Sequence, residues 1–186
     1  MMDAPTTPMK VIGFAGESGA GKTGLVEKLI GHLKARGLRV SVVKHAHHSF
    51  DVDQPGKDSW RHREAGAFEV VVASNQRLVL QRQFEQAAKL SPHHLIAELY
   101  TGVDWVLVEG FKDSDLLKME VWRPCTGKAV RYPHDDFIVA IATDEPKALP
   151  QPTNLDVLDL NDPEKVADWL MQHQDRFIYQ SPLVNP

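Results

Sequence analysis

The 186-residue sequence has little cysteine, no excess of positive charge and no long uninterrupted apolar run. Its single cysteine, Cys125, excludes an internal disulfide and a zinc site built on several cysteines, which is typical of a reducing cytoplasm. The formal net charge of −4 gives no overall attraction to nucleic acid or to an anionic membrane, so we expect neither as a partner. Charged residues interrupt the apolar stretches, which predicts no export signal and no membrane span.

The remaining composition suits one compact domain. A 42% share of hydrophobic residues is enough for a real core in a chain of this length. We expect a single domain over residues 9–176, preceded by a flexible N-terminus at 1–8 and followed by a flexible tail at 177–186.

Residues 16–23 read Gly-Glu-Ser-Gly-Ala-Gly-Lys-Thr and match the phosphate-binding pattern GxxxxGK[ST]. The glycines let successive backbone amides point inward at a helix N-terminus, Lys22 reaches the phosphates, and Thr23 offers its hydroxyl to Mg²⁺. A glycine-rich turn can also open a helix without a ligand, but the apolar run before the loop and the helical pattern after it favour nucleotide binding. The nucleotide-binding residues predicted here are Gly16, Glu17, Ser18, Gly19, Ala20, Gly21, Lys22 and Thr23.

The order of apolar runs and helical patterns predicts an α/β protein with the three-layer P-loop NTPase fold and a mostly parallel sheet. The run at residues 39–44 indicates a second buried parallel strand, one helix after the first. The expected strands lie near 10–15, 39–44, 104–108, 118–122, 136–142 and 155–160, and the expected helices near 22–35, 58–65, 91–100 and from 163 onward.

Two β-rich runs, within residues 68–81, predict a hairpin that the alternating pattern does not require. Either this extension makes the sheet mixed, or it reaches out to a partner.

Ligands of open parallel sheets bind beyond the carboxyl ends of the strands, so residues at those ends can converge. Mg²⁺ needs hard oxygen ligands, and the candidates are Thr23, Asp53 and Glu109. Glu109 is the stronger carboxylate because it ends an apolar strand, although either acid could simply be solvated. Lys22 and Asp53 are the residues that we expect to act on the phosphates.

The polar segment after the second strand invites several interpretations. Its histidines suit a transition metal, contacts to a phosphate or pterin, or an ordinary loop. Arg61 and Arg63 suit a phosphate, but they can equally pair with Asp58 or Glu64. The candidate cofactor- or partner-binding residues are Lys44, His45, His47, His48, Arg61, Arg63 and Lys112.

Thr143 and Asp144 follow a later strand and are candidates for contacting the base. A carboxylate there can accept hydrogen bonds from N1 and the exocyclic amine of guanine, which adenine cannot offer. Asp144 can also be a turn residue before Pro146, and the Asn-Lys-x-Asp motif of regulatory GTPases is absent from the sequence.

Four stretches together resemble the MobB family of molybdopterin-guanine dinucleotide biosynthesis adaptor proteins. They are the loop at 16–23, the run at 44–59, the segment at 63–67 and the strand end at 106–112. The resemblance covers residues 9–170, and its second stretch is more specific than the loop, which many NTPases share.

This resemblance implies a GTP-binding protein with weak hydrolysis that works beside the guanylyltransferase joining GMP to molybdopterin. It also implies a homodimer to which the hairpin at 68–81 contributes. The wider architecture is similar to dethiobiotin synthetase and nickel-chaperone GTPases, where carboxylates in the positions of Asp53 and Glu109 approach the metal. A small-molecule kinase or a metal-delivery GTPase that uses the histidines is the alternative function.

Overall fold

The computed structural model describes residues 8–46 and 50–183 of the chain. Contacts between backbone positions divide the chain into two compact units. One is formed by Met1–His45 with Ser91–Pro186, and the other is Ala46–Leu90. The domain limits at 9 and 176 stay a prediction.

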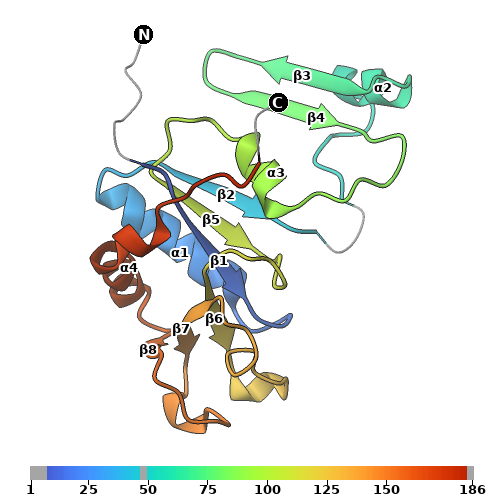
Figure 1. Ribbon diagram of the computed structural model, residues 1–186. Helices are drawn as coiled ribbons and strands as arrows, with labels where there is room; N and C mark the ends of the chain where they lie inside the picture. Colours follow the sequence, from blue (N-terminus) through green and yellow to red (C-terminus); the bar gives the residue numbers. More distant parts are fainter. Residues whose placement is uncertain (1–7, 47–49, 184–186) are drawn as a thin grey trace. The chain divides into compact units, whose positions relative to one another are not determined.

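The first unit contains a six-stranded sheet with the strand order β2-β5-β1-β6-β7-β8 (Figure 1). All five strand pairings are parallel, which confirms the predicted α/β class. The strands are β1 (Lys10–Ala15), β2 (Val40–Lys44), β5 (Trp105–Glu109), β6 (Lys118–Trp122), β7 (Ile138–Thr143) and β8 (Asp156–Asp159).

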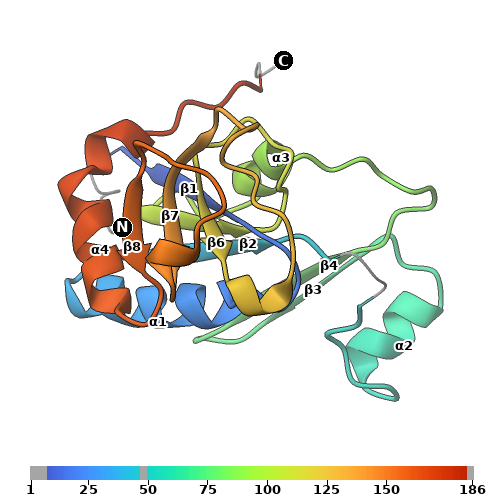
Figure 2. The same ribbon diagram turned by 90° about the horizontal axis from the view of Figure 1, so that it is seen from below.

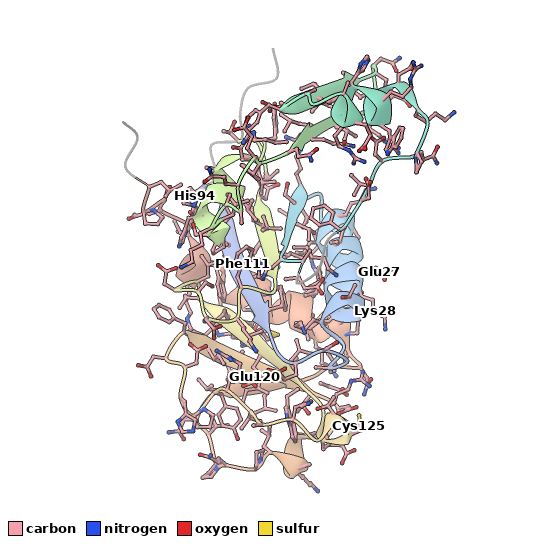
Figure 3. All side chains as sticks on the ribbon, turned by 90° about the vertical axis from the view of Figure 1, so that its right-hand side faces the viewer. Glu27, Lys28, His94, Phe111, Glu120 and Cys125 are labelled. Carbon is pink, nitrogen blue, oxygen red and sulfur yellow. The ribbon has the colours of Figure 1, made fainter. Side chains whose placement is uncertain are left out.

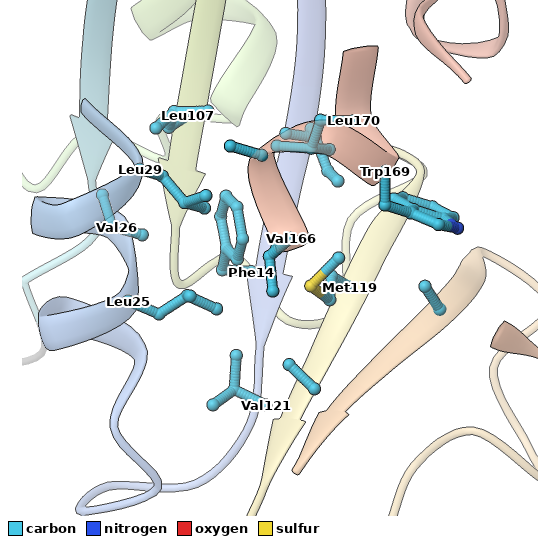
Figure 4. Close-up of a cluster of buried hydrophobic side chains, with 14 of the residues drawn as sticks. Phe14, Leu25, Val26, Leu29, Leu107, Met119, Val121, Val166, Trp169 and Leu170 are labelled. Carbon is cyan, nitrogen blue, oxygen red and sulfur yellow. The ribbon is translucent and has the colours of Figure 1, made fainter. Parts of the chain in front are cut away.

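Helices cover both faces of this sheet. Helices α1 (Lys22–Ala35) and α4 (Pro163–Gln172) lie side by side on one face (Figures 1 and 2), and the short α3 (Pro92–Ala97) packs on the other. The periodicity of α1 places Leu25, Leu29 and Leu33 on one stripe, and all three are buried in the core. Leu25 and Leu29 are labelled in Figure 4. Burial of such a side chain contributes about 1.5–3 kcal/mol.

Strand β2 differs from the expectation of a second buried strand. Val43 is buried, but Val42 is 40% exposed. The reason is its place in the sheet: β2 is an edge strand that pairs only with β5 among the described strands, and β5 lies between it and β1. Sequential strands joined by one helix are therefore not neighbours here.

Two ionisable side chains of β6, Lys118 and Glu120, are almost completely buried (Glu120 is labelled in Figure 3). Glu120 accepts hydrogen bonds from the backbone N–H of Arg131 at 2.7 Å and of Tyr132 at 2.8 Å. The Lys118 ammonium lies 3.1 Å from the Asp135 carboxylate. Burial raises the pKa of Glu120. These contacts hold the long loop after β6 against the sheet.

The second unit contains helix α2 (Asp58–Glu64) and strands β3 (Glu69–Ala73) and β4 (Leu78–Arg82). The strands pair antiparallel, which confirms the hairpin. They form a separate two-stranded sheet among the described residues, so the hairpin does not make the main sheet mixed. The turn closes locally because the Ser74 hydroxyl accepts from the N–H groups of Gln76 and Arg77.

The described residues near the C-terminus pack on the rest of the first unit, to which they belong. Phe177, the last residue of a 3₁₀ turn, is buried in the core, and the Tyr179 N–H donates to the Met9 carbonyl at 2.9 Å. His93 connects the Tyr179 hydroxyl, at 2.8 Å, to the Asp115 carboxylate, at 2.7 Å. Among the described residues, no helix has the length and apolarity needed to cross a membrane.

Candidate functional site

The loop at residues 16–23 connects β1 to α1 at the carboxyl end of the main sheet. Gly16 has φ of +137°, and a Cβ built there would lie 2.2 Å from the Val121 carbonyl oxygen on β6. Only glycine allows the loop to pass so close to the neighbouring strand. The sheet therefore fixes where the loop begins, and α1 fixes where it ends.

Lys22 folds over this loop. Its ammonium donates to the carbonyl oxygens of Gly16 at 2.7 Å and Glu17 at 2.9 Å. Burial lowers the pKa of Lys22, while the nearby Glu109 and Glu17 carboxylates oppose that change. The charge is thus held at the concave side of the loop, where the phosphate-binding pattern requires it.

Thr23 and Glu109 come together although they are far apart in the sequence. The Thr23 hydroxyl donates to Glu109 Oε1 at 2.6 Å, and the Lys44 ammonium lies 3.2 Å from the same oxygen. Parallel pairing sets this arrangement, since Glu109 on β5 is in register with Phe14 on β1 and Lys44 on β2. A hydroxyl beside a nearly buried carboxylate is a donor set that fits Mg²⁺, which usually keeps several waters.

The segment after β5 also contacts the loop. The Lys112 ammonium lies 3.1 Å from Glu17 Oε1, and this contact lowers the pKa of Glu17. Phe111 has a left-handed φ of 50°, and its ring stacks on His45 with 4.5 Å between centroids. Of the predicted residues outside the loop, Lys112 thus contacts the loop directly at Glu17, and Lys44 contacts Glu109, the partner of Thr23. His45 packs on Phe111, which follows Glu109 by two residues.

Asp144 lies beside a residue that the sequence reasoning missed. Its Oδ2 is 3.3 Å from Arg123 Nη1. Thr143 is fully buried, and its hydroxyl accepts from the Glu145 N–H. Arg123 directly follows β6, so the strand-end rule that selected Glu109 and Thr143 would have found it.

The second unit holds three further predicted residues. Arg63 forms two 2.8 Å hydrogen bonds with Asp51, which lower the pKa of Asp51 to about 2. Arg61 is exposed on α2. Asp53 accepts from the Ser59 hydroxyl at 2.8 Å, while its Oδ2 is buried without a hydrogen-bond partner in the described structure. Their approach to the phosphate loop stays a prediction.

The metal interpretation of the histidines stays a prediction. His47 and His48 lie outside the described residues. Within the part of the chain that the structure describes, no group of three His, Cys, Asp or Glu side chains is placed to hold a metal ion.

The fold and this site define a protein of the P-loop NTPase-like class, and comparison with known proteins narrows the class to a family. The family model for "Molybdopterin guanine dinucleotide synthesis protein B" matches residues 11–144. The chain therefore belongs to the MobB family, as the sequence resemblance indicated.

Comparisons with individual relatives support the same family. The chain is 40% identical to the molybdopterin-guanine dinucleotide biosynthesis adapter protein of Escherichia coli over 173 residues, which are 91% of this chain and 95% of that protein. It is 38% identical to the adapter protein of Haemophilus influenzae, with 86% of each chain covered. The crystal structure of a MobB homologue from Bacillus stearothermophilus is 26% identical and has a TM-score of 0.67, covering 90% of this chain and 99% of that one.

Proposed function

We propose that this protein is a GTP-binding adapter in molybdenum cofactor biosynthesis that assists the conversion of molybdopterin to molybdopterin guanine dinucleotide. The adapter role is supported by the names of its relatives. One observation above all supports nucleotide binding. Thr23, which directly follows Lys22, donates its hydroxyl to Glu109 at 2.6 Å.

The residues of the loop suggest how a nucleotide binds. The Lys22 ammonium exchanges the carbonyl oxygens of Gly16 and Glu17 for phosphate oxygens, which are stronger acceptors. Thr23 and Glu109 would hold Mg²⁺, the sequence predicts Asp53 as a second carboxylate, and the metal would neutralise phosphate charge. We propose at most weak GTP hydrolysis, with Lys22 and Asp53 acting on the phosphates.

The partner in this proposal is the molybdenum cofactor guanylyltransferase, in the cytoplasm. Molybdopterin is an anionic ligand because of its phosphate group. Lys44 and Lys112 provide positive charge beside the loop, and His45 stacked on Phe111 provides an aromatic surface. These four residues are the proposed contact surface for cofactor or partner.

A homodimer is also part of the proposal. The register of β3 and β4 places Val71, Leu78 and Leu80 on one face of the hairpin, and each is at least 45% exposed. A two-stranded hairpin is marginally stable without packing, so a second copy of the chain is the proposed cover.

The test compares Lys22→Ala with Lys28→Ala, a control that removes a charge from the exposed side of the same helix (Figure 3). We expect Lys22→Ala to abolish GTP binding in calorimetry while the circular dichroism spectrum stays unchanged, and Lys28→Ala to bind as the wild type does. Unchanged affinity of Lys22→Ala would contradict the phosphate-loop assignment. Equal wild-type affinity for ATP and GTP would favour the kinase alternative.

The adapter role is tested with the same proteins. The wild-type protein, but not Lys22→Ala, should be retained by the guanylyltransferase in a GTP-dependent pull-down and should increase dinucleotide formation. Equal retention and equal dinucleotide formation with both proteins would contradict a GTP-dependent adapter role.

A further inference from the structure

Arg123 and Asp144 lie next to each other because two strands end together. Trp122, the last residue of β6, is in register with Thr143, the last residue of β7. Arg123 and Asp144 directly follow them. The Arg123 backbone is held in place as well, because its carbonyl oxygen accepts from the Thr126 hydroxyl at 2.8 Å.

The ion pair between these residues leaves hydrogen-bonding capacity unused. Arg123 Nη1 lies 3.3 Å from Asp144 Oδ2. Arg123 Nε and Asp144 Oδ1 are both buried, and neither has a hydrogen-bond partner among the described residues. Buried polar atoms in folded proteins are generally paired, and leaving them unpaired is unfavourable. The two side chains thus carry an unsatisfied donor and an unsatisfied acceptor. Both side chains are still partly exposed, at 33% and 20%, so a small rotation would present these atoms to a ligand.

The pair lies beside the phosphate loop. A Cβ built on Gly21 would be 3.4 Å from Arg123 Nε and 3.5 Å from a side-chain carbon of Leu160, which follows β8. Gly21 immediately precedes the phosphate-binding Lys22. A nucleotide with its phosphates on the loop can place its base beyond the ends of β6 and β7, where the ligands of such sheets bind.

We propose that Arg123 and Asp144 together select guanine, with Arg123 donating to O6 and Asp144 accepting from N1–H. Guanine presents an acceptor at position 6 beside a donor at position 1, whereas adenine presents a donor and then an acceptor. A neighbouring donor and acceptor match guanine and oppose adenine. Because the Arg123 guanidinium lies 3.3 Å from Asp144 Oδ2, we expect the 2-amino group to contribute less than O6 and N1–H. This inference rests on the proposed nucleotide binding and names the two residues that determine its specificity.

The experiment measures calorimetric affinities of GDP, IDP, ADP and pyrophosphate for the full chain in the presence of Mg²⁺. The wild-type protein should bind IDP, which keeps O6 and N1–H but lacks the 2-amino group, about as tightly as GDP. Arg123→Met should lower the affinity for GDP and IDP by about tenfold or more, because a hydrogen bond from a charged donor is lost. Its affinities for ADP and pyrophosphate should stay unchanged. The exposed Lys147→Gln is the matched control for charge and should change none of the four.

Several outcomes would overturn the inference. One is an unchanged ratio of GDP to ADP affinity in Arg123→Met; another is an equal loss for all four ligands, which would place Arg123 on the phosphates. IDP binding far more weakly than GDP would show that Asp144 reads the 2-amino group instead. If Arg123→Met does not fold, Arg123→Lys, which keeps the ion pair but lacks Nε–H, decides by the same ratio. Absence of any guanine nucleotide binding by the wild type would instead contradict the proposed function itself.

Discussion

Glu109 is a nearly buried acid among the predicted site residues. It is 8% exposed, it accepts a hydrogen bond from Thr23, and its carboxylate lies 3.2 Å from the Lys44 ammonium. A buried carboxylate is unfavourable unless it is paired, so these two contacts explain why the charge is tolerated. The oxygen that accepts from the hydroxyl could contact Mg²⁺ directly or through one of the waters bound to the metal.

We therefore predict that Glu109→Gln lowers the Mg²⁺-dependent gain in GTP affinity by about tenfold or more, since an amide oxygen lacks the negative charge. Calorimetry with Mg²⁺ and with EDTA measures this gain, and removal of the metal from the wild-type protein should weaken binding similarly. The control is Glu27→Gln, an exposed acid on α1 (Figure 3). An undiminished metal effect in Glu109→Gln would remove Glu109 from the metal site.

At the scale of the element, helix α1 is preceded by positions that require glycine, and it contains one glycine that alanine can replace. Gly21 precedes the helix with φ of +101°, and the loop before it depends on Gly16. Gly31 lies in the exposed part of the same helix, with ordinary helical geometry and no neighbouring atom within 4 Å of an added Cβ. Glycine in a helix interior is less favourable than alanine.

Gly31→Ala should accordingly raise the free energy of unfolding by about 0.5–1 kcal/mol, measured by urea denaturation. Gly16→Ala should lower it by about 2 kcal/mol or more, because the new methyl group would meet the Val121 carbonyl oxygen at 2.2 Å. Equal effects of the two changes would contradict the described loop geometry.

At the scale of the whole molecule, the second unit leaves most of its large apolar side chains exposed. Helix α2 contains no buried residue, and large apolar side chains of the hairpin are exposed. Stable association of two chains usually buries about 1,200–2,000 Å² in total. The paired hairpin face of Val71 and Leu80 is the apolar centre that such an interface would need.

We predict that the wild-type protein sediments as a dimer at micromolar concentration and that Leu80→Glu sediments as a monomer, because a charge would be buried in the interface. Analytical ultracentrifugation measures both. Gln76→Glu, in the turn of the same hairpin, adds the same charge outside the apolar face and should remain dimeric. A dimeric Leu80→Glu would exclude this face as the interface.

Local patterns were enough to predict much of this protein from its sequence. The apolar run of β1, the glycine-rich loop and the stripe on α1 are all encoded within a few residues of each other. They predicted the strand, loop and helix, the position of Lys22 and Thr23, and the α/β class. The hairpin was predicted for the same reason, since its turn is closed by neighbouring residues.

Tertiary structure decided which distant residues meet. The order of strands in the sheet put β5 between β2 and β1, and this made β2 an exposed edge and brought Glu109 to Thr23 across 86 residues. The register of β6 and β7 paired Arg123 with Asp144, a contact that no local pattern contains. Hydrogen bonding within a helix or turn depends on neighbouring residues, whereas strand order and register depend on how the whole core packs.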